Sequence, residues 1–438
     1  MTGLVKVLAL VPFTVGAIFA TPAAATPALD TTFGGGVISP KAFPKGKWLQ
    51  VARDAVIQDD GKVLVPMALS VKYGRRAERP VLRYSRDGAI DRSYGKNGAA
   101  WFGIEGQKYV GLTGISLQPD GKAVVFGGTA KTRAGLDAYF VARLTRSGKL
   151  DKGFGRRGVT RLAAIREWDR EILGTFSLED GRTIVAIKQS HANDDTLDLV
   201  RLKKDGTVDR GYADHGIKSL DFANGQSFPD FADIAVFGDE AYVLVNPDTE
   251  SVRHPCKLVR TSITSRGGRV KAFGNNGSVA IAASKPGNAV SCERLTLTGD
   301  GGVAVVGSEF FGDYAGTSAG VAYKFRQDGS RDPAFGVGGK IQAPDQHDFS
   351  GIAALPGGDF LVLGNRRDSE DSSVRLGGIA SNLDASGGIQ DLLAGNVLKN
   401  TDDSYLSNID HGPAGNVAVY TRFSTSGEGE ARVAKFTN

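Results

Sequence analysis

The residues best suited to chemistry are charged residues that recur as pairs. In most repeats a basic residue stands shortly before an aspartate, as in Arg143 with Asp151, Arg201 with Asp209 and, across the two ends of the chain, Lys435 with Asp30. Charge-assisted hydrogen bonds between such groups can satisfy half-buried polar atoms. We therefore predict a structural ion pair in each repeat. The alternative is a ring of charges that contacts a ligand around a central channel.

Two repeats depart from this pairing. Asn382 and Gln390 replace the base and the acid together, and a joint loss is what a pair predicts. Arg260 is followed by Val270 where the other repeats have an aspartate, so the predicted ion pair does not explain why Arg260 is present.

The histidines and the acidic stretches lack a complete metal-binding pattern. The histidines lack metal-ligand spacing, at positions 191, 215, 254, 347 and 411. The acidic stretches 193–195, 368–371 and 402–403 lack the terminal glutamate of a calcium loop, so we expect solvated loops, with calcium binding as the alternative. We assign no catalytic residue, metal or cofactor. The enzymatic alternative is a pair of carboxylates, distant in sequence, that a ring of repeats brings together for sugar chemistry.

The aspartates belong to a longer motif, Leu-Asp-x-x-Phe-Gly, which sets the period of the chain. Its aromatic position recurs about every 60 residues, as Phe33, Tyr94, Phe154, Tyr212, Phe273 and Phe335. Such a period is typical of repeat architectures. We expect these rings to fill the core between neighbouring repeats, with the glycines allowing the chain to turn around them.

A second motif predicts how each repeat folds. The motif at residues 120–125, Asp-Gly-Lys-Ala-Val-Val, occurs in seven copies along the chain. Each copy lies between two apolar runs. Glycine in a two-residue turn tolerates positive φ, so each copy predicts a β-hairpin. Further runs such as 140–144 and 158–162 give four strands per unit. The sequence therefore predicts an all-β, seven-bladed β-propeller with four-stranded blades.

The two ends of the chain complement each other. The last unit stops after its third strand, at 431–436, and the pieces it lacks stand near the N-terminus as Leu29–Gly34 and residues 37–39. We predict that this N-terminal strand closes the ring, which would leave no exposed sheet edge there.

The paired motifs, Leu-Asp-x-x-Phe-Gly-x-x-Gly-Val and Asp-Gly-Lys-Val-Val-Val, resemble the bacterial delta-60 repeat family. The resemblance covers nearly the whole chain after residue 25 and is weakest at 382–400, where the aspartate and the aromatic–glycine pair are missing. It implies an exported protein built of propeller blades and implies little chemistry.

The N-terminal residues resemble an export signal. Residues 1–25 combine Lys6, a short apolar run and the small residues 23–25, so we predict a signal peptide and a single mature domain at 26–438. The alternative is an uncleaved anchor. No later run is long enough for a membrane helix, and we expect a secreted or periplasmic monomer.

Cysteine usage and net charge narrow the class further. An exported compartment permits a disulfide between Cys256 and Cys292, and the alternative is two separate buried thiols. A net charge of +5 on 438 residues is too mild for a dedicated nucleic-acid binder.

Residues that build every blade cannot specify a ligand. We therefore expect ligand-binding residues in the connections between strands, which differ from blade to blade. The aromatic and basic candidates for a ligand face in these loops are Trp48, Trp101, Trp168, Tyr109, Arg75 and Arg76. The alternative is that the aromatic residues pack their own loops. We expect a binding or scaffold module for a protein or a cell-envelope glycan. The alternatives are a polysaccharide hydrolase or lyase with carboxylates at the channel mouth, and a purely structural surface protein.

Overall fold

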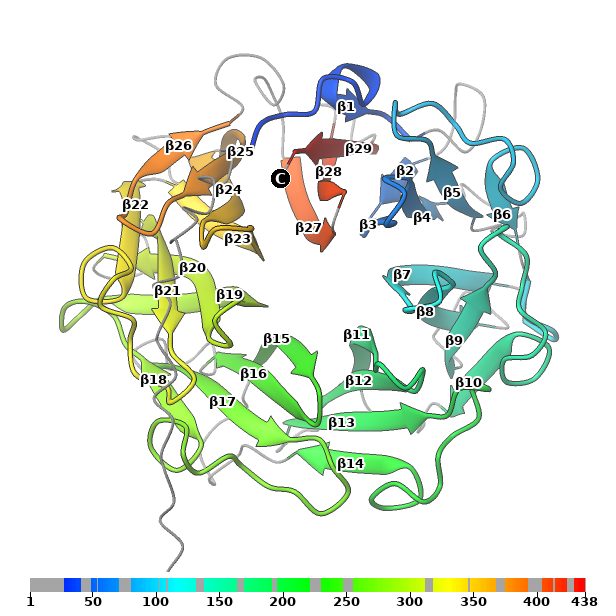
Figure 1. Ribbon diagram of the computed structural model, residues 1–438, viewed down its shortest axis with the longest axis horizontal. Coiled ribbons are helices and arrows are strands. Elements are labelled where there is room, and N and C mark those ends of the chain that lie inside the picture. Colours follow the sequence, from blue (N-terminus) through cyan, green and yellow to red (C-terminus); the bar gives the residue numbers. More distant parts are fainter. Residues whose placement is uncertain are drawn as a thin grey trace, which may run out of the picture.

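The protein folds as a ring of seven blades around a central axis (Figure 1). The computed structural model describes residues 27–40, 49–52, 54–70, 80–101, 103–107, 109–130, 138–163, 169–190, 195–220, 230–246, 255–311, 318–345, 347–367, 375–392, 404–412, 414–423 and 429–437. Each blade is an antiparallel sheet whose first strand lies at the centre of the ring and whose last strand lies at the rim. The predicted seven-bladed, all-β propeller is therefore confirmed.

The strands of the first four blades follow the chain in order. Blade 1 contains β2 (Leu49–Ala52), β3 (Val56–Ile57), β4 (Val63–Ser70), β5 (Pro80–Tyr84) and β6 (Ala99–Trp101). Blade 2 contains β7 (Tyr109–Leu117), β8 (Ala123–Ala130), β9 (Ala138–Leu144) and β10 (Val159–Ala163). Blade 3 contains β11 (Asp169–Ser177), β12 (Thr183–Ser190), β13 (Asp195–Leu202) and β14 (Ile217–Leu220). Blade 4 contains β15 (Asp230–Phe237), β16 (Glu240–Asn246), β17 (Cys256–Ser262) and β18 (Ser278–Ile281).

The remaining blades repeat this order until the ring closes. Blade 5 contains β19 (Ala289–Leu297), β20 (Val303–Phe310), β21 (Ser318–Phe325) and β22 (Lys340–Asp345). Blade 6 contains β23 (His347–Ala354), β24 (Phe360–Arg367), β25 (Arg375–Leu383) and the short β26 (Ile389–Asp391). Blade 7 contains β27 (Ser404–Gly412), β28 (Gly415–Phe423), β29 (Gly429–Phe436) and, from the N-terminus, β1 (Val37–Ile38), which follows a short 3₁₀ turn, η1 (Gly34–Gly36).

The N-terminal strand completes blade 7 as the motif at the chain ends predicts. Val37 pairs with Ala434 and Ile38 with Val433, both antiparallel. The amide of Asp30 also donates to the carbonyl of Lys435 at 2.8 Å. In Figure 1, β1 lies along the outer side of β29, so the outer edge of the last blade is covered.

The hairpin turns are one residue longer than the sequence pattern predicts. The amide of Gln118 donates to the carbonyl of Lys122, and Gly121, at φ 74°, donates back to Gln118. The loop therefore has three residues, with a type I turn followed by a left-handed glycine that forms a bulge. The Asp-Gly pair predicted the hairpin correctly, because glycine is needed in either geometry, but it did not distinguish the two loop lengths.

The hydrophobic core lies between the blades. Each junction between neighbouring blades holds one cluster of buried side chains in the part of the chain that is described. The aromatic ring of the repeat motif belongs to most of them, as Phe33, Tyr94, Phe154, Phe273 and Phe335. The motif therefore supplies a core plug to the junction rather than a surface for a ligand.

Candidate functional site

The charged pair of the repeat motif ties one blade to the next. Arg143 Nε donates to Asp151 Oδ2 at 2.9 Å, and Arg143 Nη1 donates to the backbone carbonyl of Lys204 in blade 3 at 2.7 Å. The guanidinium also lies 4.6 Å from the centre of the Phe154 ring. One buried arginine thus donates hydrogen bonds to the aspartate and to a carbonyl of the next blade, and it stacks on the face of the core aromatic ring.

The same arrangement, a basic side chain paired with the repeat aspartate, recurs around the ring, and we call it the clamp. Its ion pairs are Arg83–Asp91 at 2.9 Å, Arg201–Asp209 at 2.8 Å, Lys324–Asp332 at 2.9 Å and Lys435–Asp30 at 3.0 Å. The last of these joins the two ends of the chain. With so many hydrogen-bond partners inside the fold, these charges serve the blades.

The two exceptions use substitutes from another motif. Arg260 donates to Glu240 Oε2 at 2.7 Å, and the glutamate comes from the first residue of β16. In blade 6, Asn382 Nδ2 donates to Asp359 Oδ2 at 3.2 Å, again from beside the first hairpin turn. The acid that Val270 lacks is therefore supplied from the neighbouring hairpin, a contact that the motif spacing could not show.

The clamp changes the acidity of its aspartates. Burial alone would raise the pKa of Asp91, but hydrogen bonds from Ser93 and the charges of Arg83 and Lys62 outweigh it and hold that pKa at about 2. The pKa values of Asp30, Asp151 and Asp332 are also lowered, each with a basic partner among the causes. These carboxylates remain ionised over the physiological pH range.

Carboxylates on the inner strands also tie blades together. Asp54 Oδ2 accepts from the amide of Ile115 in blade 2 at 2.8 Å, and Asp233 Oδ2 accepts from the amide of Leu295 in blade 5 at 2.9 Å. Asp410 in blade 7 does the same for Ile57 in blade 1 at 3.0 Å. Each of these carboxylates is bonded to the backbone of the next blade.

Asp233 is an inner-strand carboxyl whose pKa is shifted by its surroundings. Burial raises its pKa, although the charge of Arg294 and hydrogen bonds from the amides of Leu295 and Ile234 act in the opposite direction. Its two oxygens face these two amides, with Ile234 donating at 2.9 Å. This arrangement favours a tie between blades 4 and 5.

One cavity of about 710 Å³ lies near the rim, between blades 1 and 2. Residues 95–97, Ala99 and Trp101 of blade 1 line one side, and residues 148–150 of blade 2 line the other. Trp101 is half-buried and packs against the hydrophobic cluster between blades 7 and 1. Lys96 and Lys149 are exposed, and neither ammonium forms an ion pair with any residue that the structure describes.

The predicted ligand face is described only in part. Trp48, Trp168, Arg75 and Arg76 lie outside the described residues, as does the side chain of Tyr109, whose backbone begins β7. Trp101 was expected within a connection, but it is the last residue of β6, where it pairs with Pro80. The tryptophan is therefore held on the outermost strand of its blade, away from the channel mouth.

Lys96 and Lys149 were not singled out by the sequence. They occupy positions of the repeat that other blades fill with residues of every type, so no pattern marks them. Their significance depends on the approach of a turn of blade 2 to the corner of blade 1, which the backbone contact between Gly95 and Ser147 at 2.8 Å fixes.

The sequence also contains one serine motif of a kind found in hydrolases. Residues 316–320 read Gly-Thr-Ser-Ala-Gly, the pattern of a hydrolase nucleophile elbow. Ser318 is buried at the start of β21, where its hydroxyl bonds Asp348 Oδ1 at 3.0 Å. A nucleophile elbow needs an exposed serine between a strand and a helix, so this match lacks the required context.

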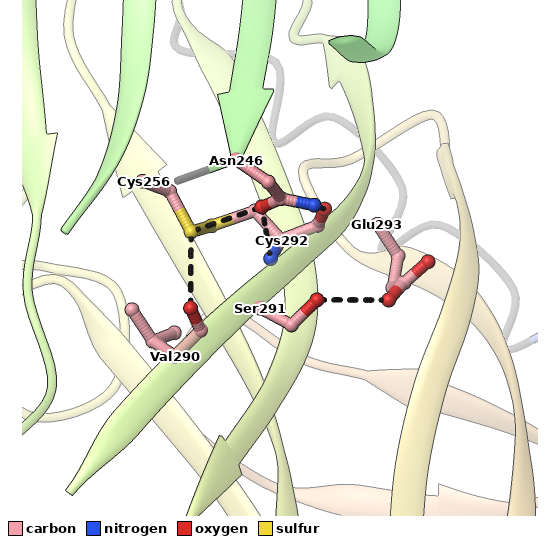
Figure 2. The surroundings of a disulfide bond; sticks show 6 residues. All are labelled: Asn246, Cys256, Val290, Ser291, Cys292 and Glu293. Carbon is pink, nitrogen blue, oxygen red and sulfur yellow. Dashed lines mark hydrogen bonds between the residues drawn. A yellow bond between two sulfur atoms is a disulfide. The ribbon is translucent and has the colours of Figure 1, made fainter. Parts of the chain in front are cut away.

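The two cysteines join neighbouring blades. Cys256 of β17 and Cys292 of β19 form a disulfide between blades 4 and 5, with their Cα atoms 6.3 Å apart (Figure 2). The side chain of Asn246 lies beside it and bonds both the amide and the carbonyl of Cys292 at 2.9 Å. Both cysteines are buried, so the bridge belongs to the core of this junction.

Metal ligands do not gather in the described part of the chain. No group of three or more His, Cys, Asp or Glu side chains is placed there to hold an ion. The described residues also contain no helix with the length and hydropathy of a membrane span.

Comparisons with known proteins agree on the fold. A family described as "Domain of unknown function (DUF5122) beta-propeller" matches residues 118–154. No curated protein sequence matches the chain. The crystal structure of the polysaccharide lyase Uly1 is similar over 93% of this chain and 95% of its own, with 9% identity and a TM-score of 0.55.

Two further solved structures are more distant. A protein of unknown function from Dyadobacter fermentans is 9% identical over 92% of this chain and 99% of its own, with a TM-score of 0.40. The Trypanosoma rangeli sialidase is 9% identical over 88% of this chain and 55% of its own, with a TM-score of 0.42. At such low identity, the likeness to Uly1 shows the propeller fold alone.

Proposed function

We propose that this protein is an exported binding module that presents aromatic and basic residues to a cell-envelope glycan. The observation that carries the proposal is the composition of the cavity between blades 1 and 2. Trp101, Lys96 and Lys149 are among the residues that line it, and no residue with a carboxylate side chain is. Aromatic and basic side chains are typical of binding sites, whereas glycoside hydrolysis needs a pair of carboxyl groups.

The use of the other charged residues supports binding over catalysis. The repeat aspartates are held by their basic partners, and Asp54, Asp233 and Asp410 are held by backbone amides. A catalytic acid or base must be able to reach a substrate, and these groups are occupied between blades. Uly1, which has a similar fold, is a polysaccharide lyase, which makes a polysaccharide ligand a reasonable first choice.

The proposal is tested by an affinity pull-down from cell-envelope extracts. The purified protein should retain a glycan fraction, and the Trp48→Ala, Trp101→Ala double variant should lose most of it at a temperature where circular dichroism shows that the variant remains folded. Val337→Ala is the control, because Val337 is a 90% exposed apolar residue at the matching corner of blade 5. Equal retention by the double variant, or retention of protein with no glycan, would contradict the proposal.

The second candidate is a polysaccharide-active enzyme, and the raised pKa of Asp233 is the observation that favours it. A general acid must carry a proton at the working pH, and a raised pKa favours the protonated form. Turnover on a panel of polysaccharides, abolished by Asp233→Asn at an unchanged melting temperature, would favour this candidate over binding.

A further inference from the structure

We infer that the cavity between blades 1 and 2 is a subsite for an acidic sugar residue, with the Trp101 ring against the sugar face and the Lys96 and Lys149 ammonium groups around its anionic group. The inference rests on the proposed function and specifies the ligand class. The volume of the cavity, about 710 Å³, lies within the usual range for small-ligand sites.

The side chains of the cavity depart from what the repeat requires. The strand register aligns Trp101 with Arg161, Ser219, Ala280 and Gln342 in the next four blades. Tryptophan is thus peculiar to this junction among these positions. A residue that only built the blade would have similar counterparts elsewhere in the ring.

The two lysines depart from the repeat in the same place. Lys96 corresponds to Arg156, Asp214, Asn275 and Val337 in the following blades, and Lys149 corresponds to Ala89, Thr207 and Ser330. Both are among the residues that line one cavity, and they come from different blades. At the next junction the cations are engaged, because Arg156 pairs with Glu105 at 3.9 Å and Arg161 donates to the Glu105 carbonyl.

The chemistry of these groups selects an acidic sugar over a neutral one. The face of an indole carries negative charge density and attracts the partly positive C–H groups of a sugar ring. Lysine supplies a flexible point charge that suits a carboxylate or a sulfate. With two ammonium groups that lack an acidic partner among the described residues, an anionic ligand gains from both charges, whereas a neutral sugar gains only from the ring.

The arrangement is also partly preorganised. Lys96 stands between Gly95, whose amide donates to Ser147 of blade 2, and Asn97, whose φ of 54° sets the bend of the corner. Trp101 is held by its packing against the cluster between blades 7 and 1. Binding therefore orders the lysine side chains and little of the backbone, which keeps the entropic cost low.

Isothermal titration calorimetry of the purified protein tests the inference. The probes are an oligogalacturonate, a sulfated oligosaccharide and a neutral cello-oligosaccharide of equal length. We expect the acidic probes to bind at least about tenfold more tightly than the neutral one at low salt, with the difference shrinking as salt screens the charges. The stronger of the two acidic probes identifies the anionic group.

Charge-neutral variants locate the site. Lys96→Gln with Lys149→Gln should remove the preference for acidic probes and leave neutral binding unchanged. Lys271→Gln with Lys285→Gln removes the same charge from exposed positions of blade 4 and its connection to blade 5 and should leave the preference intact. Trp101→Ala should weaken all probes; if it unfolds, Trp101→Phe, which keeps a ring, should show intermediate affinity.

The outcomes separate the inference from the proposed function. If no oligosaccharide binds the wild type, the proposed function fails. If all probes bind equally and the two-lysine variant behaves as wild type, the inference fails while the proposed function stands. A single-stranded oligonucleotide that binds as tightly as oligogalacturonate, with the same dependence on Lys96 and Lys149, would also overturn the inference in favour of a general polyanion site.

Discussion

The junction between blades 1 and 2 and the junction between blades 4 and 5 have the same backbone and different side chains. Gly95 and Gly274 both have φ 54°, and the residues two positions later, Asn97 and Asn276, have φ 54° and 52°. Each glycine donates its amide to a turn of the following blade, at 2.8 Å and 2.7 Å. The corner thus has the same backbone structure at both junctions.

The two junctions are held by different means. Between blades 1 and 2 the arginine clamp, Arg83 with Asp91, acts without a covalent link. Between blades 4 and 5 the clamp uses Glu240 in place of the missing aspartate, and a disulfide with Asn246 beside it reinforces the core. The devices that hold a junction are therefore interchangeable, which leaves other positions of a corner open to change. At the first junction those positions hold Lys96, Trp101 and Lys149.

The largest expected effect is on stability and concerns the disulfide, which of these two junctions only the one between blades 4 and 5 has. Cys256→Ala with Cys292→Ala should lower the free energy of unfolding by about 4 kcal/mol, because the bridge closes a loop with a sequence separation of 36 residues. Equilibrium denaturation with guanidinium measures the loss, and a reductant should reproduce it in the wild type. Unchanged stability in both experiments would show that the covalent link is redundant.

The clamp of the first junction should have the next largest effect. Arg83→Ala should cost about 3 kcal/mol, because the side chain is 8% exposed and its loss leaves the carboxylate of Asp91 and the carbonyl of Arg146 without their partner. Chemical denaturation measures the change. Arg260→Ala, whose partner Glu240 is 30% exposed, should cost less; an equal or greater cost would contradict this ranking of the clamps.

Acid should weaken the clamp of the first junction. Because the pKa of Asp91 is about 2 in the folded protein and 3.8 ordinarily, its contribution is present above pH 4 and is lost as the pH falls through 2. This carboxyl alone should contribute about 2 kcal/mol to that loss. Unfolding free energies between pH 2 and pH 7 test this: the drop should be smaller by that amount in Asp91→Asn. A drop of the same size in wild type and variant would contradict it.

The smallest expected effect tests whether Glu240 replaces the missing aspartate of the clamp in blade 4. Glu240→Gln should cost about 1 kcal/mol, since it removes the charge that pairs with Arg260. Adding Val270→Asp should restore most of it, because Val270 occupies the position from which the other blades supply their acid. A double-mutant cycle measured by denaturation gives the coupling. If the rescue is absent, Glu240 is more than a replacement for the lost aspartate.

The sequence could predict the fold because its motifs repeat with a fixed period and each has a local physical meaning. The Asp-Gly pairs require hairpins, the recurring aromatic rings require a core between blades, and the leftover strand at residues 37–38 requires closure. The pairing of Arg143 with Asp151 follows from their constant spacing within a blade.

What the sequence could not predict depends on contacts between different motifs and between blades. Glu240 replaces the acid at Val270 from a different motif, so alignment of one motif does not reveal it. The cavity requires Lys149 of blade 2 to lie against the corner of blade 1, which no spacing within a blade encodes. Inner carboxylates such as Asp54 and Asp233 appear in only some blades and lack a repeat signal.

Hydrogen exchange of the wild-type protein with and without an acidic oligosaccharide tests the central claim most directly. If the first junction is the ligand site, segments 95–101 and 147–150 should gain protection on binding, while the matching segments 274–280 and 328–331, with the same backbone and different side chains, should not change. Protection of both corners alike, or protection confined to the inner strands around the channel, would contradict the account.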